Sequence, residues 1–294
     1  MGKLVNLVVA ASLLYGVNGS CVPQQVNSLM GSAKIEQVEK TNSLGELVES
    51  VYCVRTERVY EDPYGKRLTQ IASGSALAYQ EEGNYSYIIT NQHLMGDEEI
   101  YVNGGNFRKV SIAPSIVDYG GDKNTADDIS LELVWESEKL DLAILRTPAK
   151  LKVLDREWMG DSNNLKYGEE VYLIGYPLGM FNAVTKGIVA NPGKYQRGMA
   201  IRDEINNLFV PSYNRKILDL TVNPGNSGGP FFVKRNGEFY WMGLIDSYLI
   251  HQAGGPLHRE NSGLGMGNGS SFIRDITDYI IHNVGEIVES KNSK

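Results

Sequence analysis

The sequence predicts an all-β fold. Short apolar runs alternate with turn signals at intervals of about ten residues. Glycine and tyrosine are frequent, with 32 and 17 residues, and no long helical periodicity precedes the C-terminal region. Short strands at such spacing are typical of β-sandwiches and barrels. The 294 residues, 42% of them hydrophobic, are enough to bury a large core. The formal net charge of −7 disfavours a nucleic-acid or anionic-membrane surface.

Residues 1–20 have the order of an export signal. A positive charge at Lys3 precedes the apolar run 4–17, and small residues suited to cleavage follow at 18–20. The run is short for a transmembrane helix. A buried first strand or helix of the fold is the alternative, but the order of charge, apolar run and small residues favours a signal peptide.

The two cysteines leave two interpretations open. Cys21 directly follows the expected cleavage site, so it is a candidate for lipidation and membrane anchoring, although Asn18 stands where lipoprotein signals usually carry an aliphatic residue. Cys53 lies in the apolar stretch 51–54 and is expected in a core strand. In an exported chain, a Cys21–Cys53 disulfide is the alternative, and it excludes lipidation. Residues 21–43 are predicted to be a polar linker.

The folded part is expected to begin at residue 44, and the polar stretch 160–169 is expected to separate two halves. Apolar side chains at helical spacing predict a C-terminal amphipathic helix over residues 272–284. Arg-Asn-Gly at 235–237 predicts a tight hairpin turn. The predicted strands are residues 71–79, 85–90, 99–102, 109–117, 129–135, 141–146, 170–176, 183–190, 216–222, 231–234 and 238–245.

Residues 223–230 (Asn-Pro-Gly-Asn-Ser-Gly-Gly-Pro), hereafter the serine loop, place the hydroxyl of Ser227 among glycines and prolines. Glycine permits positive φ and close approach of another backbone, and proline fixes φ. Such a loop can expose the serine Oγ and aim backbone N–H groups at one point, as a serine nucleophile requires. The alternative is a glycine-rich hairpin with a polar tip and no chemistry.

A catalytic serine needs a base within hydrogen-bond reach and a group that orients the base. The chain has four histidines, and only His93 stands at the end of a predicted strand. Asp141 opens an apolar run, where a carboxylate is costly without a partner such as an imidazole N–H. A structural histidine and an ordinary strand-end acid are the alternatives. The order His93, Asp141, Ser227 is that of the chymotrypsin-type triad, and the serine loop lacks the Gly-x-Ser-x-Gly elbow.

At this point the motifs resemble those of HtrA/DegP-like trypsin-fold serine proteases. Three of them carry the triad: Thr-Asn-Gln-His-Leu at 90–94, Asp-Leu-Ala-Ile-Leu at 141–145, and the serine loop. Further matches fall between these motifs in the family's order, at residues 74–77, 160–162, 175–179 and 184–189 and at Asp219. The similarity extends from about residue 47 to about residue 276.

The resemblance implies two six-stranded antiparallel β-barrels, at about residues 44–158 and 165–272, with the active site in the cleft between them. The C-terminal α-helix at 272–284 would complete a protease domain of residues 44–285, and residues 286–294 would form a tail.

The resemblance also implies the roles of the site residues. His93 would be the general base and then the acid, Asp141 would orient its imidazole, and Ser227 would attack the scissile carbonyl. Backbone N–H groups of Gly225 and Ser227, together with that of Asn226, would form the oxyanion hole.

The substrate pocket, by the same resemblance, has its base at Thr221, six residues before the nucleophile. Its wall would lie around Gly243, Leu244 and Ile245. Thr221 is small and uncharged, which disfavours a preference for Arg or Lys and favours a small or medium apolar P1 residue. The nearby acids Asp219 and Asp246 argue in the opposite direction.

The sequence departs from the family in three places. Ten residues follow Val284, too few for a PDZ domain. Residues 263–270 are far richer in glycine than the family's last strand. The polar loop 195–214 corresponds to one that orders the oxyanion hole in the family, which implies regulated activity.

No cofactor or metal site is expected, because the chain has neither His-x-x-x-His nor a cysteine cluster with ligand spacing. The sequence therefore predicts an exported serine endopeptidase, periplasmic or extracellular, that acts on polypeptides and not on nucleic acid. Its oligomeric state stays open. A trypsin-fold binding or scaffold protein is the alternative from another class, and an esterase using the same triad is a third.

Overall fold

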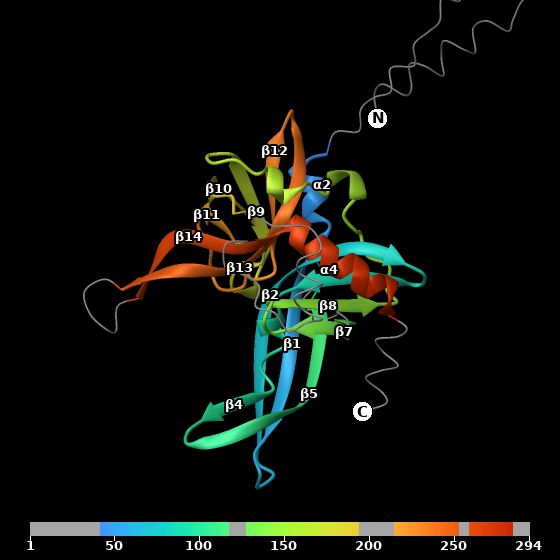
Figure 1. The fold of residues 1–294 in the computed structure, drawn as a ribbon. Coiled ribbons are helices and arrows are strands. Elements are labelled where there is room, and N and C mark those ends of the chain that lie inside the picture. The colour runs from blue at the N-terminus through green and yellow to red at the C-terminus, as the bar shows by residue number, and fades with distance from the viewer. Residues whose placement is uncertain (1–41, 118–127, 194–214, 253–258, 285–294) are drawn as a thin grey trace, which may run out of the picture. The chain divides into compact units, whose positions relative to one another are not determined.

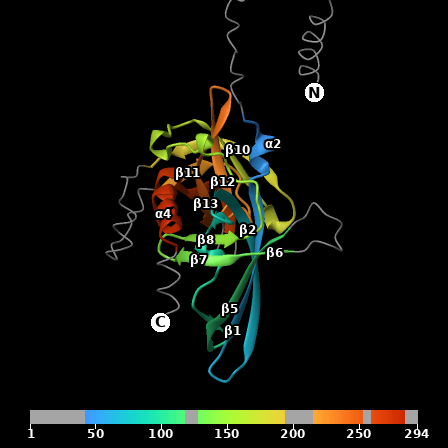
Figure 2. The ribbon, with the colours of Figure 1, turned by 90° about the vertical axis from the view of Figure 1, so that its right-hand side faces the viewer.

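Two β-sheet systems make up the computed structural model (Figures 1 and 2). The structure describes residues 42–117, 128–193, 215–252 and 259–284, with side chains described outside 248–262. The expected signal peptide, Cys21, the linker up to residue 41 and the tail fall outside these ranges, as does almost all of the loop 195–214. None of the helices in the described ranges is long and apolar enough to span a membrane.

The first half is an eight-stranded antiparallel sheet that, in the residues described, curls without closing into a barrel. It follows helix α2 (Leu44–Val48), whose first turn carries a capping box between Ser43 and Glu46. The strands β1, β2 and β5 pair over a long stretch and project as an arm (Figure 1). In chain order the strands are β1 (Val51–Glu61), β2 (Arg67–Glu82), β3 (Tyr85–Thr90), β4 (Glu99–Val102), β5 (Gly105–Val117), β6 (Ile129–Ser130), β7 (Glu132–Ser137) and β8 (Leu142–Thr147).

The second half is a closed six-stranded antiparallel barrel in the order β10-β11-β14-β13-β12-β9. Helix α4 (Ser270–His282) follows the last strand directly. The barrel strands are β9 (Glu170–Gly175), β10 (Ala183–Asn191), β11 (Arg215–Asp219), β12 (Pro230–Arg235), β13 (Glu238–Gln252) and β14 (Arg259–Gly269). Short 3-10 turns are η2 (Gln92–Leu94), η3 (Arg156–Trp158), η4 (Ser162–Asn164) and η5 (Pro177–Gly179).

The predicted all-β fold with a C-terminal helix is confirmed, and β3 and β4 have the predicted bounds. Other bounds differ from the prediction: β2 and β13 are longer, β11 ends earlier, and α4 begins and ends two residues before the predicted range 272–284. Two further differences concern the sheets. The first sheet stays open, whereas the second closes. The glycine-rich stretch 263–270 forms most of β14, which pairs with both β11 and β13. A Cβ at Gly267 would clash with the carbonyl of Leu244 on β13, so the glycines allow the close packing of this strand.

One hydrophobic core spans the two halves. Tyr79 of β2 and Trp241 of β13 are both fully buried and meet edge to face, with ring centroids 5.9 Å apart. Helix α4 buries Phe272, Ile273 and other apolar side chains of one face in the same cluster. Such aromatic pairs and the buried helix face fix the two sheet systems against each other.

Lys216 is a charged residue inside the second barrel. Its side chain is fully buried on β11, and its Nζ has no hydrogen-bond partner among the described residues. Burial lowers the pKa of Lys216 to about 8, and the charge of Asp161 opposes that shift. Because the folded state binds this proton less tightly than the unfolded chain, the free energy of unfolding should rise as the pH increases from about 8 toward 10.5.

Replacing Lys216 by methionine should stabilise the protein at pH 7. The substitution keeps an unbranched side chain and removes a buried, unpaired charge, so we expect a gain of about 1 to 3 kcal/mol in the free energy of unfolding. Urea unfolding at pH 7 and at pH 10 measures the effect, and the gain should shrink at the higher pH. Lys150→Met, at an exposed position, is the control. A K216M protein no more stable than the wild type at pH 7 would contradict the argument.

Candidate active site

The serine loop connects β11 to β12 and is held by backbone hydrogen bonds. Within the loop, Asn226 N donates to Asn223 O (3.0 Å) and Gly229 N donates to Asn226 O (2.8 Å). Toward β13, Gly228 N donates to Ile245 O (2.8 Å), and Ile245 N donates to Gly229 O (2.9 Å). The loop is therefore a fixed continuation of the barrel.

The loop glycines are required by the packing. Gly225 and Gly228 have φ of +94° and +79°. A Cβ at Gly225 would clash with the carbonyl of Tyr176, and one at Gly228 would clash with the carbonyl of Ser75 and the hydroxyl of Thr90. Both positions thus combine a left-handed backbone with close approach of another chain segment. These contacts distinguish the loop from a solvent-exposed glycine turn.

Ser75 of β2 joins the first sheet to the serine loop. It is fully buried, and its N–H donates to Ser227 O (2.8 Å). Its hydroxyl donates to Gly225 O (2.7 Å) and accepts from Tyr176 N (2.8 Å). Its carbonyl accepts from the hydroxyl of Thr90 at the end of β3 (2.7 Å). Ser75 thus connects the carbonyl groups of Gly225 and Ser227 to the end of β3, which leads to His93.

His93 and Asp141 are paired. The imidazole Nδ1 lies 3.0 Å from each carboxylate oxygen of Asp141, and the backbone N–H of His93 donates to Asp141 Oδ1 at 3.0 Å. Asp141 holds a left-handed backbone conformation (φ +47°), and its carbonyl accepts from the side chain of Asn91 (3.0 Å). Because a carboxylate only accepts, the neutral ring carries its proton on Nδ1 and its lone pair on Nε2.

The predicted triad residues are placed as follows. Among the hydrogen bonds of the described residues, none joins the Ser227 hydroxyl to the His93 ring. The serine loop is instead connected to the segment that carries His93 through hydrogen bonds of Ser75. Ser75 binds the Ser227 carbonyl on one side and the hydroxyl of Thr90, three residues before His93, on the other. The His93 side chain is 43% exposed and that of Asp141 21%. The imidazole is therefore more accessible to solvent than the Asp141 carboxylate.

The predicted oxyanion-hole groups differ in their engagement. In the part of the chain that the structure describes, the N–H groups of Gly225 and Ser227 have no hydrogen-bond acceptor. The N–H of Asn226 is occupied by the carbonyl of Asn223. Two N–H groups on one tight loop are thus available for an incoming anion or carbonyl oxygen.

The predicted pocket residues lie around the serine loop. Thr221 is exposed just after β11. Leu244 and Ile245 are buried and contribute to two different hydrophobic clusters, so they offer mainly backbone to a bound ligand. A Cβ at Gly243 would clash with the carbonyl of Asn268 on β14 and with the ring of Phe231. Asp246 is buried directly after Ile245.

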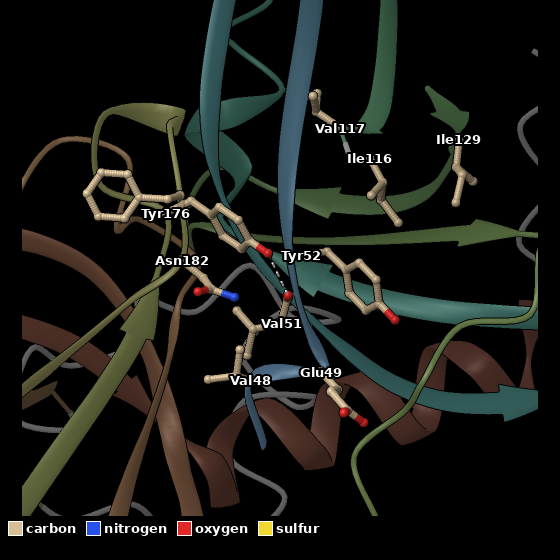
Figure 3. A pocket seen from close by; sticks show the side chains of 10 residues that line it. Val48, Glu49, Val51, Tyr52, Ile116, Val117, Ile129, Tyr176 and Asn182 are labelled. Carbon is tan, nitrogen blue, oxygen red and sulfur yellow. Dashed lines mark hydrogen bonds between the residues drawn. The ribbon is translucent and has the colours of Figure 1, made fainter. Parts of the chain in front are cut away.

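An open cavity of about 470 Å³ lies beside Tyr176 and contains none of the predicted site residues (Figure 3). The Tyr176 hydroxyl donates to Val51 O (3.3 Å), while its backbone N–H binds Ser75. Tyr176 therefore lies between this cavity and the serine loop. The apolar lining comes mainly from Val48, Tyr52, Ile116, Ile129 and Phe181.

Among the described residues, no group of three or more His, Cys, Asp or Glu is arranged to hold a metal ion.

Residues 73–240, more than half of the chain, match the family model of the trypsin-like peptidase domain. The chain belongs to the trypsin-like peptidase family. A probable periplasmic serine endoprotease, DegP-like, of Hahella chejuensis is 34% identical to this chain over 200 residues. The aligned region covers 67% of this chain and 34% of that protein. A serine protease, HtrA-like, of Staphylococcus epidermidis is 31% identical over 174 residues, 58% of the chain and 26% of that protein. The chain thus spans about a third or less of the length of these curated relatives.

The fold has counterparts among solved structures. That of the HtrA-type protease AlgW with a decapeptide superimposes with a TM-score of 0.51 at 22% identity, covering 84% of this chain and 67% of that one. At this identity the likeness concerns the fold. The resemblance to the HtrA/DegP-like trypsin fold is confirmed by the family match and by these relatives.

Three contributors to the trypsin-like site were not identified from the sequence. The motif around Gly74 and Ser75 matched the family's strand before the histidine, but nothing in it indicated that Ser75 binds the serine loop. Thr90, the first residue of the motif at 90–94, donates its hydroxyl to the Ser75 carbonyl from the end of β3. Arg215 approaches the Asp246 carboxylate, at 3.3 Å, from β11. All of these are contacts between residues distant in the chain.

Replacing Gly228 by alanine should destabilise the protein and disrupt the serine loop. The new Cβ meets the Ser75 carbonyl in addition to the cost of a left-handed alanine, so we expect a loss of about 2 to 4 kcal/mol in the free energy of unfolding. Gly65→Ala is the matched control, because Gly65 has φ +80° and no atom within 4 Å of the added Cβ. It should lose about 1 kcal/mol. If urea unfolding shows the same loss of unfolding free energy in both variants, the close approach at Gly228 does not contribute to stability.

Proposed function

We propose that this chain is an exported serine endopeptidase that hydrolyses peptide bonds through the triad His93, Asp141 and Ser227. The observation that carries the proposal is the His93–Asp141 pair, with 3.0 Å between Nδ1 and both carboxylate oxygens, in a structure whose serine loop is held rigidly by Ser75 and Ile245. Export is supported by the charge, apolar run and small residues that follow one another in residues 1–20. It is also supported by the name of the Hahella relative, which describes a periplasmic serine endoprotease.

The reaction begins with attack of Ser227 Oγ on the scissile carbonyl. His93 Nε2 takes the serine proton, and Asp141 stabilises the resulting imidazolium through the Nδ1–H bond. The oxygen of the tetrahedral intermediate accepts from the N–H groups of Gly225 and Ser227, which have no other acceptor among the residues described. The imidazolium then protonates the leaving amine, which leaves an acyl-enzyme on Ser227. Water, activated by His93, hydrolyses this ester and restores the serine.

The proposed substrates are polypeptides in an exposed conformation, such as unfolded or specific envelope proteins. Thr221 is uncharged and exposed at the proposed base of the pocket, which favours a small or medium apolar P1 side chain. The Asp246 carboxylate pairs with Arg215 at 3.3 Å, and its side chain is 1% exposed. That acid is therefore not available to bind an arginine or lysine side chain of a substrate.

Replacing Ser227 by alanine tests the proposed nucleophile. A fluorophosphonate probe forms a bond from serine Oγ to phosphorus with loss of fluoride, so only an activated serine is labelled. We expect the wild type to be labelled and to cleave unfolded casein, and Ser227→Ala to lose labelling and at least about 10,000-fold in casein cleavage. Ser111→Ala, at an exposed position of β5, is the control and should behave like the wild type.

Other outcomes of this experiment lead to other conclusions. A wild type that resists the probe while remaining folded would overturn the endopeptidase proposal and favour a latent trypsin-fold binding protein. A wild type that is labelled and hydrolyses ester substrates but no peptide would favour an esterase. Labelling that persists in Ser227→Ala would mean that a different residue is the nucleophile.

A peptide series that varies only at P1 tests the proposed pocket. We expect kcat/KM for alanine or valine at P1 to exceed that for arginine by about tenfold or more. Thr221→Asp should raise the relative rate for arginine, because it places a carboxylate at the proposed base. Thr69→Asp, an exposed threonine on the β1–β2 arm, is the matched control for the added charge. An unchanged ratio in Thr221→Asp would place the pocket elsewhere.

A further inference from the structure

Asp246 is a buried acid beside the serine loop that the proposed reaction does not use. It follows Ile245, the residue whose backbone holds Gly228 and Gly229, and it is 4% exposed. The hydroxyl of Ser247 donates to its Oδ1. Arg215, a partly exposed residue of β11, places Nη2 3.3 Å from its Oδ2, yet Oδ2 has no hydrogen bond within the described part of the chain.

The environment of this carboxyl includes the proposed catalytic pair. Burial raises the pKa of Asp246 to about 6, with the charge of Asp141 acting in the same direction. The charge of Arg215, the bond from Ser247 and the charge of His93 act against the shift. Electrostatic interaction is mutual, so the charge on Asp246 also acts on each of these two residues.

Asn268 connects the strands of these groups through its backbone and its side chain. On β14, Asn268 pairs in register with Arg215 on one side and with Leu244 on the other. Its side-chain amide donates to the carbonyl of Leu140 (3.1 Å), next to Asp141. The strands that carry Arg215 and Asp246 are therefore tied to the turn that carries the orienting acid. Among the described residues, the charged groups acting on Asp246 are Arg215 from β11, Asp141 from the turn before β8 and His93 from η2.

We propose that the Arg215–Asp246 ion pair, which Asn268 ties to the turn that carries Asp141, contributes to the electrostatic field in which His93 accepts the proton of Ser227. The proposal rests on the proposed triad. Ionised Asp246 favours the imidazolium, and Arg215 opposes it. When Asp246 takes up a proton, the Arg215 charge is no longer balanced and disfavours the imidazolium. His93 then remains neutral, and able to act as a base, to lower pH than it would beside an ionised Asp246.

Asp246→Asn tests this coupling, because it keeps the shape of the side chain and removes its charge. The midpoint of the His93 ring titration, followed by NMR, should fall by about 0.5 to 1 pH unit. The acid limb of the fluorophosphonate labelling rate should shift by the same amount. In the double variant Arg215→Gln with Asp246→Asn, the remaining positive charge is also removed, and the midpoint should return at least half-way toward the wild-type value.

The matched control is Glu170→Gln. Glu170 is an exposed acid of the same barrel, paired with Lys186 at 2.6 Å, so its replacement also removes one negative charge and breaks an ion pair. It should leave the His93 midpoint and the acid limb unchanged. A purely structural role of Asp246 would lower stability in denaturant unfolding without moving the titration of the folded protein.

The outcomes separate this inference from the proposed function. An unchanged His93 midpoint in folded Asp246→Asn, or an equal shift in Glu170→Gln, would overturn the coupling whether or not the enzyme is active. A shifted midpoint in a protein that is never labelled would support the coupling and overturn the endopeptidase function on which its role depends. Shifts of the midpoint and of the labelling rate together are the expected result.

Discussion

The site depends on the close approach between the serine loop and Ser75. Two residues of the loop, Gly225 and Ser227, offer their carbonyls to the side chain and the N–H of this one buried serine. That engagement leaves the N–H groups of the same two residues without an acceptor among the residues described. The loop's engaged acceptors and its unengaged donors therefore belong to the same two residues. A side chain at Gly228 would push the loop away from Ser75 and remove this arrangement.

The shared core explains why such a contact between two sheet systems can be rigid. Tyr79 and Trp241 pack at the junction, and α4 covers the same cluster with one buried face. Ser75 lies four residues before Tyr79 on β2, and Ile245 lies four residues after Trp241 on β13. Each strand thus contributes one residue to the junction core and another to the support of the serine loop. Packing in the core therefore fixes the strands that support the serine loop and its backbone donors. Donors held in place before a reaction do not have to reorganise during it.

The predictable features were those with a short-range signal. Alternating apolar residues between turn signals identified β3 and β4 with their bounds, and helical spacing identified α4. The five-residue helix α2 was missed, although Ser43 and Glu46 have the spacing of its capping box. The openness of the first sheet and the formation of β14 from a glycine-rich stretch depend on strands that meet only in three dimensions. Ser75 and Gly225 are 150 positions apart, and Arg215 and Asp246 lie on different strands, so no local pattern could connect them. By contrast, His93 just after one strand and Asp141 just before another each lie in a recognisable motif, and the structure brings their side chains within 3.0 Å of each other.

The described side chains of the second barrel bury charge at two places, Lys216 and Asp246, and the surroundings of these two residues differ. Lys216 has no hydrogen-bond partner among the described residues, and the charge that favours its protonated form comes from Asp161, on the loop before η4. Asp246 has a counter-ion, a hydroxyl donor and two further charged neighbours, His93 and Asp141. A buried charge without partners can only cost stability, whereas one surrounded by titrating groups also changes their proton affinities. The same desolvation that makes Asp246 expensive also reduces the screening between it and the imidazole. The proposed effect of Asp246 on His93 follows from these charged neighbours, which the buried Lys216 lacks.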